Sequence, residues 1–150
     1  MANAAVEEDI ETNTNCSPTQ QAIIDVPHRL FAAWDRGDAA GVAAQFTTDG
    51  HMIPSNGAYL TSRQAIAAYY QKAFAGPLKD TRMIGEPLSV RCLSNSTAVI
   101  DGLGGMLMPG DTYTDPEQVP IGQRIIVSWT AVRINGVYYM KEFQSTLVQG

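Results

Sequence analysis

The sequence has no long hydrophobic run, and cysteine is scarce. A transmembrane helix needs about 20 consecutive apolar residues, so we expect no membrane span. The first residues are acidic and include neither a basic residue nor an apolar core, which argues against a secretory signal and favours a cytoplasmic protein. Cys16 and Cys92 are too few and too far apart for a metal site or a disulfide framework, and we interpret both as incidental thiols.

Positive charge is sparse as well. The chain holds 10 lysine and arginine residues against 15 aspartate and glutamate residues, for a net charge of −5. The basic residues are scattered singly and form no stripe that could neutralise phosphates, so we expect no nucleic-acid partner. No glycine-rich dinucleotide-binding motif follows a strand-like run, and we expect no nicotinamide, flavin, metal or other cofactor.

The remaining composition is that of a globular protein. Of the 150 residues, 45% are hydrophobic, which suffices for one domain with a substantial core. Residues 1–16 are polar and acidic, and we expect them to form a disordered tail, because ordering them would bury too little apolar surface to offset its entropy cost. Residues 17–150 are expected to form a single domain.

Helices are predicted first along the chain, and strands dominate the second half. Capping residues and glycine stops predict helices over residues 17–37, 38–45 and 61–76, with a kink or a restart at Pro27. Alternating and β-rich runs predict strands over residues 46–53, 58–60, 82–92, 97–103, 123–134 and 137–146. Residues 104–122 form a long connection, of a kind that often serves as a functional lid.

This order of elements indicates an α+β fold. We expect three N-terminal helices packed in the concave face of a strongly curved, mostly antiparallel sheet. Because six strands would have only three helices to cover them, we expect the sheet to close into a cone-like barrel with a cavity at its open end.

The last two strands give the most specific prediction. Asn135-Gly136 between two β-rich runs predicts a type I′ turn, because both central residues of that turn have positive φ. The turn places Ile134 opposite Val137, and the period of two then fixes which side chains share a face. One face carries Ile125, Val127, Trp129, Ala131, Tyr138, Met140, Glu142 and Gln144. The two polar groups among large apolar ones indicate a wet pocket.

Glu142 is therefore the first candidate for a catalytic acid or base. A carboxylate beside large apolar side chains loses solvation and holds its proton more readily, which suits proton-transfer chemistry. An ion pair with Arg124 or Arg82 is the structural alternative. Gln144, on the same face, either orients a substrate carbonyl or bonds a helix end.

Two further polar residues are candidates. Asp101 follows a strand-like run and precedes Gly102, so it either enters the cavity as a second acid or base or marks a bend in the sheet. His51 lies on the first predicted strand. It has no second histidine or cysteine nearby and is not a metal signature, so it either contacts the substrate or occupies a sheet edge.

Aromatic residues are expected to supply the other substrate contacts. The candidates are Trp34, Tyr69 and Tyr70 on predicted helices and Trp129 and Tyr138 on the terminal hairpin, together with the apolar Met140 beside them. A cavity lined by such side chains with a few polar groups is typical of a small-molecule site, particularly for a flat hydrophobic ligand. Ordinary core packing is the alternative for each of them.

The opposite face of the same hairpin mixes polar and apolar side chains. Its expected members are Ile126, Ser128, Thr130, Val132, Tyr139, Lys141, Phe143 and Ser145. A face of this kind suits a contact between two copies related by a two-fold axis, so we expect a homodimer through the outer sheet face. A monomer is the alternative.

Several short motifs resemble a known family. They are Ala33-Trp34 followed by Asp38, Phe46 with Asp49-Gly50, residues 73–77 with Thr81-Arg82, residues 104–110, and Phe143-Gln144-Ser145-Thr146. With the order of elements, they resemble the SgcJ/EcaC branch of the nuclear-transport-factor-two-like superfamily, also described as SnoaL-like or cystatin-like cones. The resemblance implies a curved sheet around three helices, a deep pocket, a homodimer, and a place in polyketide or enediyne antibiotic biosynthesis.

These observations lead to one leading hypothesis and two alternatives. We expect a pocket protein of secondary metabolism that binds a hydrophobic small molecule and that, as an enzyme, would act as a cofactor-independent isomerase, cyclase or dehydratase. The alternatives are a non-enzymatic protein that sequesters or delivers such a compound and a dimerisation module without a ligand. Related cones that isomerise steroids carry a carboxylate base where Ile53, Pro54 and Ser55 stand here, so that chemistry is not expected.

Overall fold

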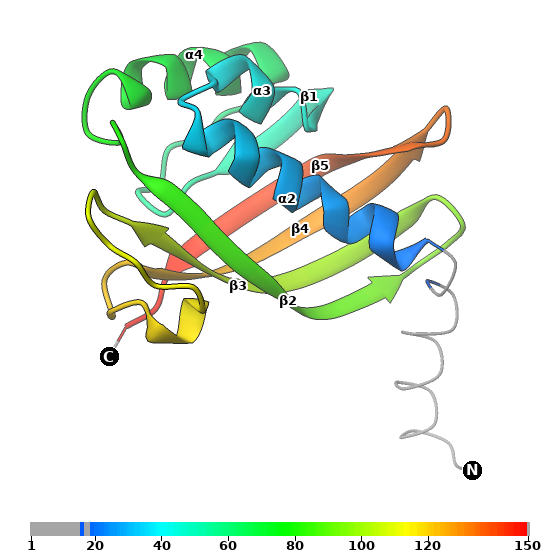
Figure 1. The fold of residues 1–150 in the computed structure, drawn as a ribbon. Coiled ribbons are helices and arrows are strands. Elements are labelled where there is room, and N and C mark those ends of the chain that lie inside the picture. The colour runs from blue at the N-terminus through cyan, green and yellow to red at the C-terminus, as the bar shows by residue number, and fades with distance from the viewer. Residues whose placement is uncertain (1–15, 17–18, 150) are drawn as a thin grey trace.

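The computed structural model describes Cys16 and residues 19–149. Residues 1–15 of the predicted acidic tail and the Ser17-Pro18 start of the first helix lie outside the described residues. Cys16, the last residue of that predicted tail, is buried in the fold, so the tail boundary at residue 16 is wrong. The described chain contains three α-helices, a short 3-10 helix and five strands. Figure 1 shows the three helices gathered on one side of the sheet, so the α+β prediction is confirmed.

The helices follow the predicted segments closely. Their bounds are Gln20–Asp35 for α2, Ala39–Ala43 for α3 and Arg63–Phe74 for α4. Helix α2 continues through Pro27 and does not restart there. Gly37, with φ of 65°, follows its end as expected, and the Asp38 side chain caps α3. The helix predicted from residue 61 begins at Arg63, and the Ser62 hydroxyl caps it by accepting a hydrogen bond from the backbone N–H of Ala65.

The five strands form one sheet in the order β1-β5-β4-β3-β2. Their bounds are Phe46–Ile53 for β1, Arg82–Cys92 for β2, Thr97–Leu107 for β3, Arg124–Ile134 for β4 and Val137–Leu147 for β5. Strands β1 and β5 are parallel, and the other neighbours are antiparallel. The expected sixth strand at residues 58–60 contributes only an isolated bridge between Leu60 and Met52.

Strand β3 extends further than predicted. The sequence indicates an end at Leu103, because glycines follow and glycine is unfavourable in strands. Gly104 and Gly105 nevertheless stay in the sheet, where Gly104 pairs with Gly85 of β2. The remaining connection to β4 is shorter than expected and contains the 3-10 helix η1 at Pro116–Gln118.

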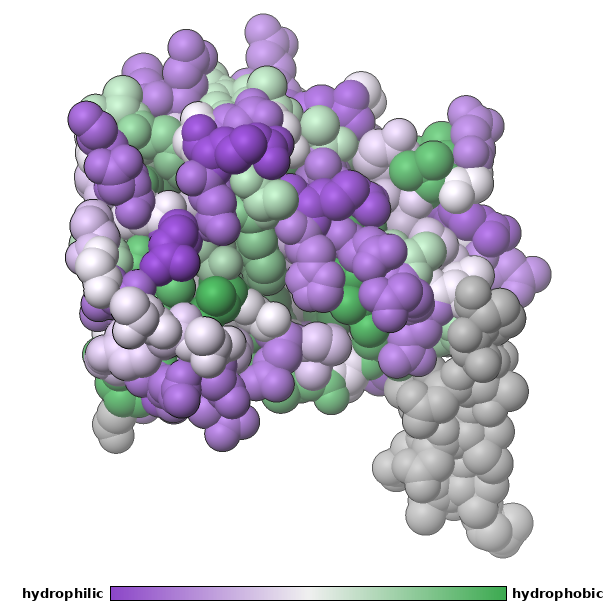
Figure 2. Space-filling model, viewed as in Figure 1, coloured by the Kyte–Doolittle hydropathy of each residue, from purple (hydrophilic) through white to green (hydrophobic). Residues whose placement is uncertain are grey.

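Helix α2 supplies much of the core. Its buried residues recur at helical spacing and are Ile23, Val26, Leu30, Ala33 and Trp34. The helix lies across one face of the sheet (Figure 1). On the face of the molecule drawn in Figure 2, hydrophilic residues dominate and hydrophobic ones show only in small patches. No helix among the described residues is long and apolar enough to cross a membrane.

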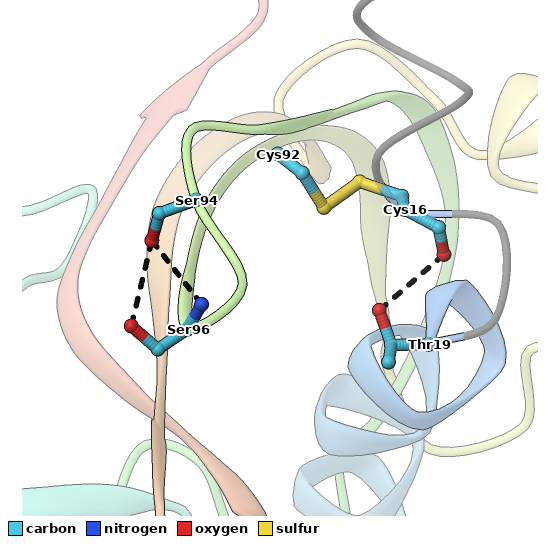
Figure 3. Close-up of a disulfide and its surroundings, with 5 residues drawn as sticks. All are labelled: Cys16, Thr19, Cys92, Ser94 and Ser96. Carbon is cyan, nitrogen blue, oxygen red and sulfur yellow. Dashed lines mark hydrogen bonds between the residues drawn. A yellow bond between two sulfur atoms is a disulfide. The ribbon is translucent and has the colours of Figure 1, made fainter.

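Cys16 and Cys92 form a disulfide, so their interpretation as incidental thiols is wrong. The bond joins the region before α2 to the end of β2 (Figure 3). Both cysteines are buried, and their Cα atoms are 5.5 Å apart. Their distance along the sequence is no obstacle, because the sheet brings the end of β2 to the start of the helix.

The terminal hairpin begins as predicted. Asn135 and Gly136 have φ values of 52° and 81°, the signs that a type I′ turn requires. Ile134 pairs with Val137, and the same register continues to the pair of Ala131 and Met140.

One residue further, the predicted register is wrong. Thr130 pairs with Glu142, so Lys141 is an extra residue in β5 and forms a β-bulge. Because successive side chains of a strand point to opposite faces, one extra residue reverses every side chain beyond it. The interior therefore receives Phe143, Ser145 and Leu147, and the outer face receives Glu142 and Gln144.

The bulge lies beside an irregular stretch of β1. Five residue steps of β1, from 46 to 51, face only two steps of β5, from 140 to 142. The Lys141 ammonium binds both oxygens of the Asp49 carboxylate at 2.8 and 2.7 Å, which lowers the pKa of Asp49. A Cβ atom on Gly50 would lie 3.2 Å from a β5 carbonyl oxygen, so the close approach of the two strands favours glycine there. The two irregularities therefore accommodate each other.

The disulfide should stabilise the fold strongly. Because it joins residues separated by 76 positions, chain entropy gives a contribution on the order of 4 kcal/mol to the free energy of unfolding. We expect Cys92→Ser, and reduction of the wild type with a phosphine, to lower the urea midpoint equally. The phosphine should leave Cys92→Ser unchanged. Equal midpoints for the oxidised and reduced wild type would contradict this role.

Candidate functional site

A cavity of about 240 Å³ lies between helix α2 and the inner face of the sheet. The two helices α2 and α4, the turn after β1 and all five strands contribute to its lining, most of which is apolar. The polar side chains in the lining are His28, Ser55, Asn56, Tyr69, Tyr70, Glu86, Gln123 and Ser145. Because ligand pockets usually measure roughly 300–1,000 Å³, this cavity suits a small ligand.

Three glycines help to make room for the cavity. Gly85 of β2 and Gly102 and Gly104 of β3 all line it, and Gly85 pairs directly with Gly104. The sheet therefore lacks side chains at three neighbouring inner positions. A Cβ atom on Gly85 would lie 2.9 Å from the ring of Phe31, so this aromatic ring of α2 can approach the sheet closely. Helix α2 thus contacts the sheet at Gly85, and the cavity lies beside this contact.

Helices α2 and α4 contribute aromatic rings. The ring centroids of Trp34 and Tyr70 are 5.2 Å apart, and those of Tyr69 and Tyr70 are 5.0 Å apart. The Trp34 indole N–H donates to the Thr81 hydroxyl at 2.9 Å, and that hydroxyl donates to the carbonyl of Leu78 at 2.7 Å. The indole nitrogen therefore has its partner within the protein.

The two tyrosines of α4 differ in their polar contacts. The Tyr69 hydroxyl accepts a hydrogen bond from the Asn56 side-chain amide at 2.9 Å, which ties α4 to the turn after β1. The Tyr70 side chain is only 2% exposed, and its hydroxyl has no hydrogen-bond partner among the described residues. Burial, with a smaller contribution from Tyr69, raises the pKa of Tyr70 well above its usual value. This hydroxyl therefore stays protonated.

Five residues predicted to bind substrate line the cavity. They are Trp34, Tyr69, Tyr70, Trp129 and Met140. Their contact with a ligand stays a prediction. Tyr138, the sixth of that group, is buried but is not part of the lining, and the guanidinium carbon of Arg133 lies 6.0 Å from its ring centre.

Glu142, Gln144 and His51 lie outside the cavity. The prediction that Glu142 and Gln144 face the interior is wrong, because the bulge at Lys141 turns both outward. The Glu142 side chain is 50% exposed, and its carboxylate is 3.6 Å from Nδ1 of His51. The His51 ring packs edge-on against the exposed Tyr59 at 5.6 Å. The three predicted site residues therefore belong to the outer surface.

Asp101 also points away from the cavity. Its carboxylate is 3.5 Å from the Arg91 guanidinium on β2, and the neighbouring Gly102 lines the cavity instead. The arginines considered as partners of Glu142, which are Arg82 and Arg124, donate to carbonyl oxygens of the loop between β3 and β4. Neither predicted carboxylate is placed to serve as acid or base for a ligand in the cavity.

Other lining residues did not emerge from the sequence pattern. Phe143 and Ser145 face inward only because of the bulge, and the Phe143 ring packs edge-on against Phe46 at 6.3 Å. Phe31 and the three glycines were not predicted to line the cavity. One signal was present: Asp49-Gly50 interrupts a strand-like run, and glycine inside a strand often marks a bulge.

Charged groups lie at the edge of the cavity. Among the described lining residues, the side chains that can carry charge at neutral pH are His28 and Glu86, and both are exposed. Carboxylate oxygens of Glu86, Asp115 and Glu117 lie within 4.8 Å of one another. All three side chains are exposed, and exposed acidic groups are common without a bound ion. We assign them no metal. The arrangement can hold an apolar molecule against mostly apolar side chains.

Comparison with known proteins agrees with this architecture. The profile of the SnoaL-like domain family matches residues 17–144. No significantly similar sequence was found among curated proteins. Many solved structures share the fold.

Three of those structures illustrate the similarity. A domain of unknown function with a cystatin-like fold from Nostoc punctiforme has a TM-score of 0.76 and 25% identity, covering 89% of this chain and 80% of that one. Aln2 from a Streptomyces species has a TM-score of 0.69 and 19% identity, covering 87% and 91%. A ketosteroid isomerase-like protein from Erwinia carotovora atroseptica has a TM-score of 0.66 and 15% identity, covering 87% and 96%. The latter two show the fold alone.

The raised pKa of Tyr70 has a measurable consequence. The pKa of Tyr70 in the folded protein lies above its value of about 10 in the unfolded chain. The neutral Tyr70 side chain therefore contributes fully to the stability of the fold below about pH 10, and this contribution is lost as the pH rises further. The chain has six tyrosines, and their ionisation can be followed in alkali by phenolate absorbance. Tyr70 should ionise only as the protein unfolds. Tyr70→Phe should remove that late step, and its persistence in this variant would contradict the assignment.

Proposed function

The chain belongs to the SnoaL-like domain family, and from this premise we propose that it is a small-molecule-binding protein whose ligand occupies the cavity beneath α2. The SnoaL-like fold commonly serves small-molecule binding, and isomerases and cyclases also use it. The cavity is the observation that carries the proposal. Unfilled apolar space costs packing energy, so a hollow that glycines leave between helix and sheet is best explained by a ligand that fills it.

Binding or delivery is favoured over proton-transfer catalysis. An isomerase, cyclase or dehydratase of the expected kind needs an acid or base within hydrogen-bond reach of the substrate. Glu142 and Asp101 lie outside the cavity, and the charged lining residues among those described are exposed at its edge. The enzyme alternative would gain support if a bound compound were converted by the protein.

We assign the ligand to secondary metabolism. The support is the set of short motifs that resemble the SgcJ/EcaC branch, whose members accompany polyketide and enediyne biosynthesis. The lining is consistent with such compounds, because the aromatic rings of Trp34, Tyr69, Tyr70 and Trp129 offer surfaces on which a flat, mostly apolar molecule can pack.

We further propose that the protein folds in an oxidising compartment. The support is the buried bond between Cys16 and Cys92, because a reducing cytosol keeps most thiols of mesophilic proteins free. The cytoplasmic location favoured by the acidic start of the sequence is therefore the weaker alternative.

The outer sheet face is proposed as a homodimer interface. It exposes Ile126 on β4 beside polar residues such as Ser128 and, after the bulge, Glu142 and Gln144. A mixed apolar and polar face of this kind suits a self-complementary contact.

Filling the cavity should weaken binding. Val127 lines the cavity next to Gly102, so Val127→Phe places a ring in the space proposed for the ligand. Ethylnaphthalene, an uncharged apolar probe, should bind the wild type and lose at least tenfold in affinity for this variant, as measured by ligand-observed NMR titration. Leu88→Phe, at a site 54% exposed, is the matched control and should bind normally. Equal binding to wild type and Val127→Phe would place the probe elsewhere.

A charge on the outer face should separate the subunits. Ile126 is 45% exposed, and Ile126→Glu would bury a repelling pair of carboxylates near the two-fold axis. Light scattering after size exclusion should give a dimer for the wild type and a monomer for the variant, with unchanged unfolding temperature at low concentration. A monomeric wild type at micromolar concentration would refute the interface.

A further inference from the structure

The hydroxyl of Tyr70 is a buried donor with no acceptor among the described residues. It lies on α4 in the lining of the cavity, 2% exposed, and no described residue accepts its hydrogen bond. Its polar neighbours are satisfied, since the Trp34 N–H reaches Thr81 and the Tyr69 hydroxyl accepts from Asn56. Most buried polar groups in proteins have a partner, and an unpaired one costs free energy. A bound molecule that offers an acceptor would remove this cost.

The charges around the cavity restrict that molecule further. No lysine or arginine belongs to the described lining, and Glu86, an acid, stands exposed at its edge. An anionic ligand would lose its hydration without meeting a lysine or an arginine, which is unfavourable in apolar surroundings, and His28 stands exposed at the edge of the cavity. The acceptor on the ligand should therefore be an uncharged oxygen.

The rest of the lining supports an aromatic or otherwise flat skeleton. Trp34, Tyr69 and Tyr70 pack at tilted and edge-on angles, and Trp129 lies on the sheet side of the same cavity. Ring faces and edges bind apolar rings favourably. The small volume, about 240 Å³, suits a compact molecule or one part of a larger one.

We propose that the cavity selects a neutral, mostly apolar molecule with a carbonyl oxygen, and that the Tyr70 hydroxyl donates a hydrogen bond to that oxygen. This inference rests on the proposed function, because it assumes that the cavity is the binding site. The inference goes beyond the proposed function because it names the chemical class of the ligand and the residue that recognises the ligand. Tyr70 is thereby a specificity-determining residue, and it carries out no chemical step.

Three naphthalenes substituted at the same ring position test the inference. Acetylnaphthalene carries a ketone, ethylnaphthalene is a hydrocarbon of nearly the same shape, and naphthoate is an anion. The wild type should bind the ketone about fivefold more tightly than the hydrocarbon, the usual net effect of one hydrogen bond. Naphthoate should bind most weakly. Ligand-observed NMR titration gives all three dissociation constants.

The variant Tyr70→Phe separates recognition from packing. It keeps the ring and removes the hydroxyl, so affinity for the ketone should fall to that for the hydrocarbon, while affinity for the hydrocarbon stays constant. Thermal unfolding of the free variant should occur at the wild-type temperature or above, because no described partner is lost. Tyr139→Phe, at a position that does not line the cavity, is the matched control and should keep the preference for the ketone.

The outcomes distinguish the two proposals. If none of the probes binds the wild type, or if Val127→Phe binds the hydrocarbon normally, the proposed function fails and this inference fails with it. If the probes bind in the cavity but ketone and hydrocarbon bind alike, or if the preference survives in Tyr70→Phe, only the role of Tyr70 is overturned. Tightest binding of naphthoate would overturn the selection for neutral ligands.

Discussion

The inner surface of the cavity depends on one extra residue in strand β5. Up to Met140, the hairpin follows the register that its type I′ turn sets, and Lys141 then has no partner in β4. Since strand side chains alternate strictly between two faces, this single insertion turns Phe143 and Ser145 inward. The ion pair of Lys141 with Asp49 and the close approach at Gly50 join the bulge to the matching irregularity of β1. The site is therefore apolar where a regular strand would have made it acidic.

Three features then keep the hollow open and shaped. Glycines on β2 and β3 leave inner positions without side chains, and aromatic rings from α2 and α4 line the same cavity. The disulfide between Cys16 and Cys92 ties the start of α2 to the end of β2, which fixes the helix that covers the cavity. Together these constraints give a preformed site, which reduces the entropy cost of binding a ligand. Such a site favours recognition of shape and of one polar atom.

Sequence patterns were sufficient for the fold and for part of the site. Helical spacing identified α2 and its inward Trp34, and the Asn135-Gly136 turn gave the register of the hairpin as far as Met140. These patterns did not predict the bulge, because the pairing between β1 and β5 depends on contacts between residues distant in the sequence. The same reason hid the disulfide, since its cysteines meet only after the sheet has formed. Glu142 and Gln144 were predicted to face inward by the period-two alternation of strand side chains. The bulge at Lys141, beside the irregular stretch of β1, overrides that alternation.

The central claim is that the bulge at Lys141 reverses the side chains of the last half of β5. Solution NMR tests it most directly, through nuclear Overhauser contacts between aromatic rings. The Phe143 ring should show contacts to the buried ring of Phe46, whose centre is 6.3 Å away. Contacts between the Gln144 side-chain amide and the buried Trp129 ring, with none between the two phenylalanines, would contradict the claim and restore a polar cavity.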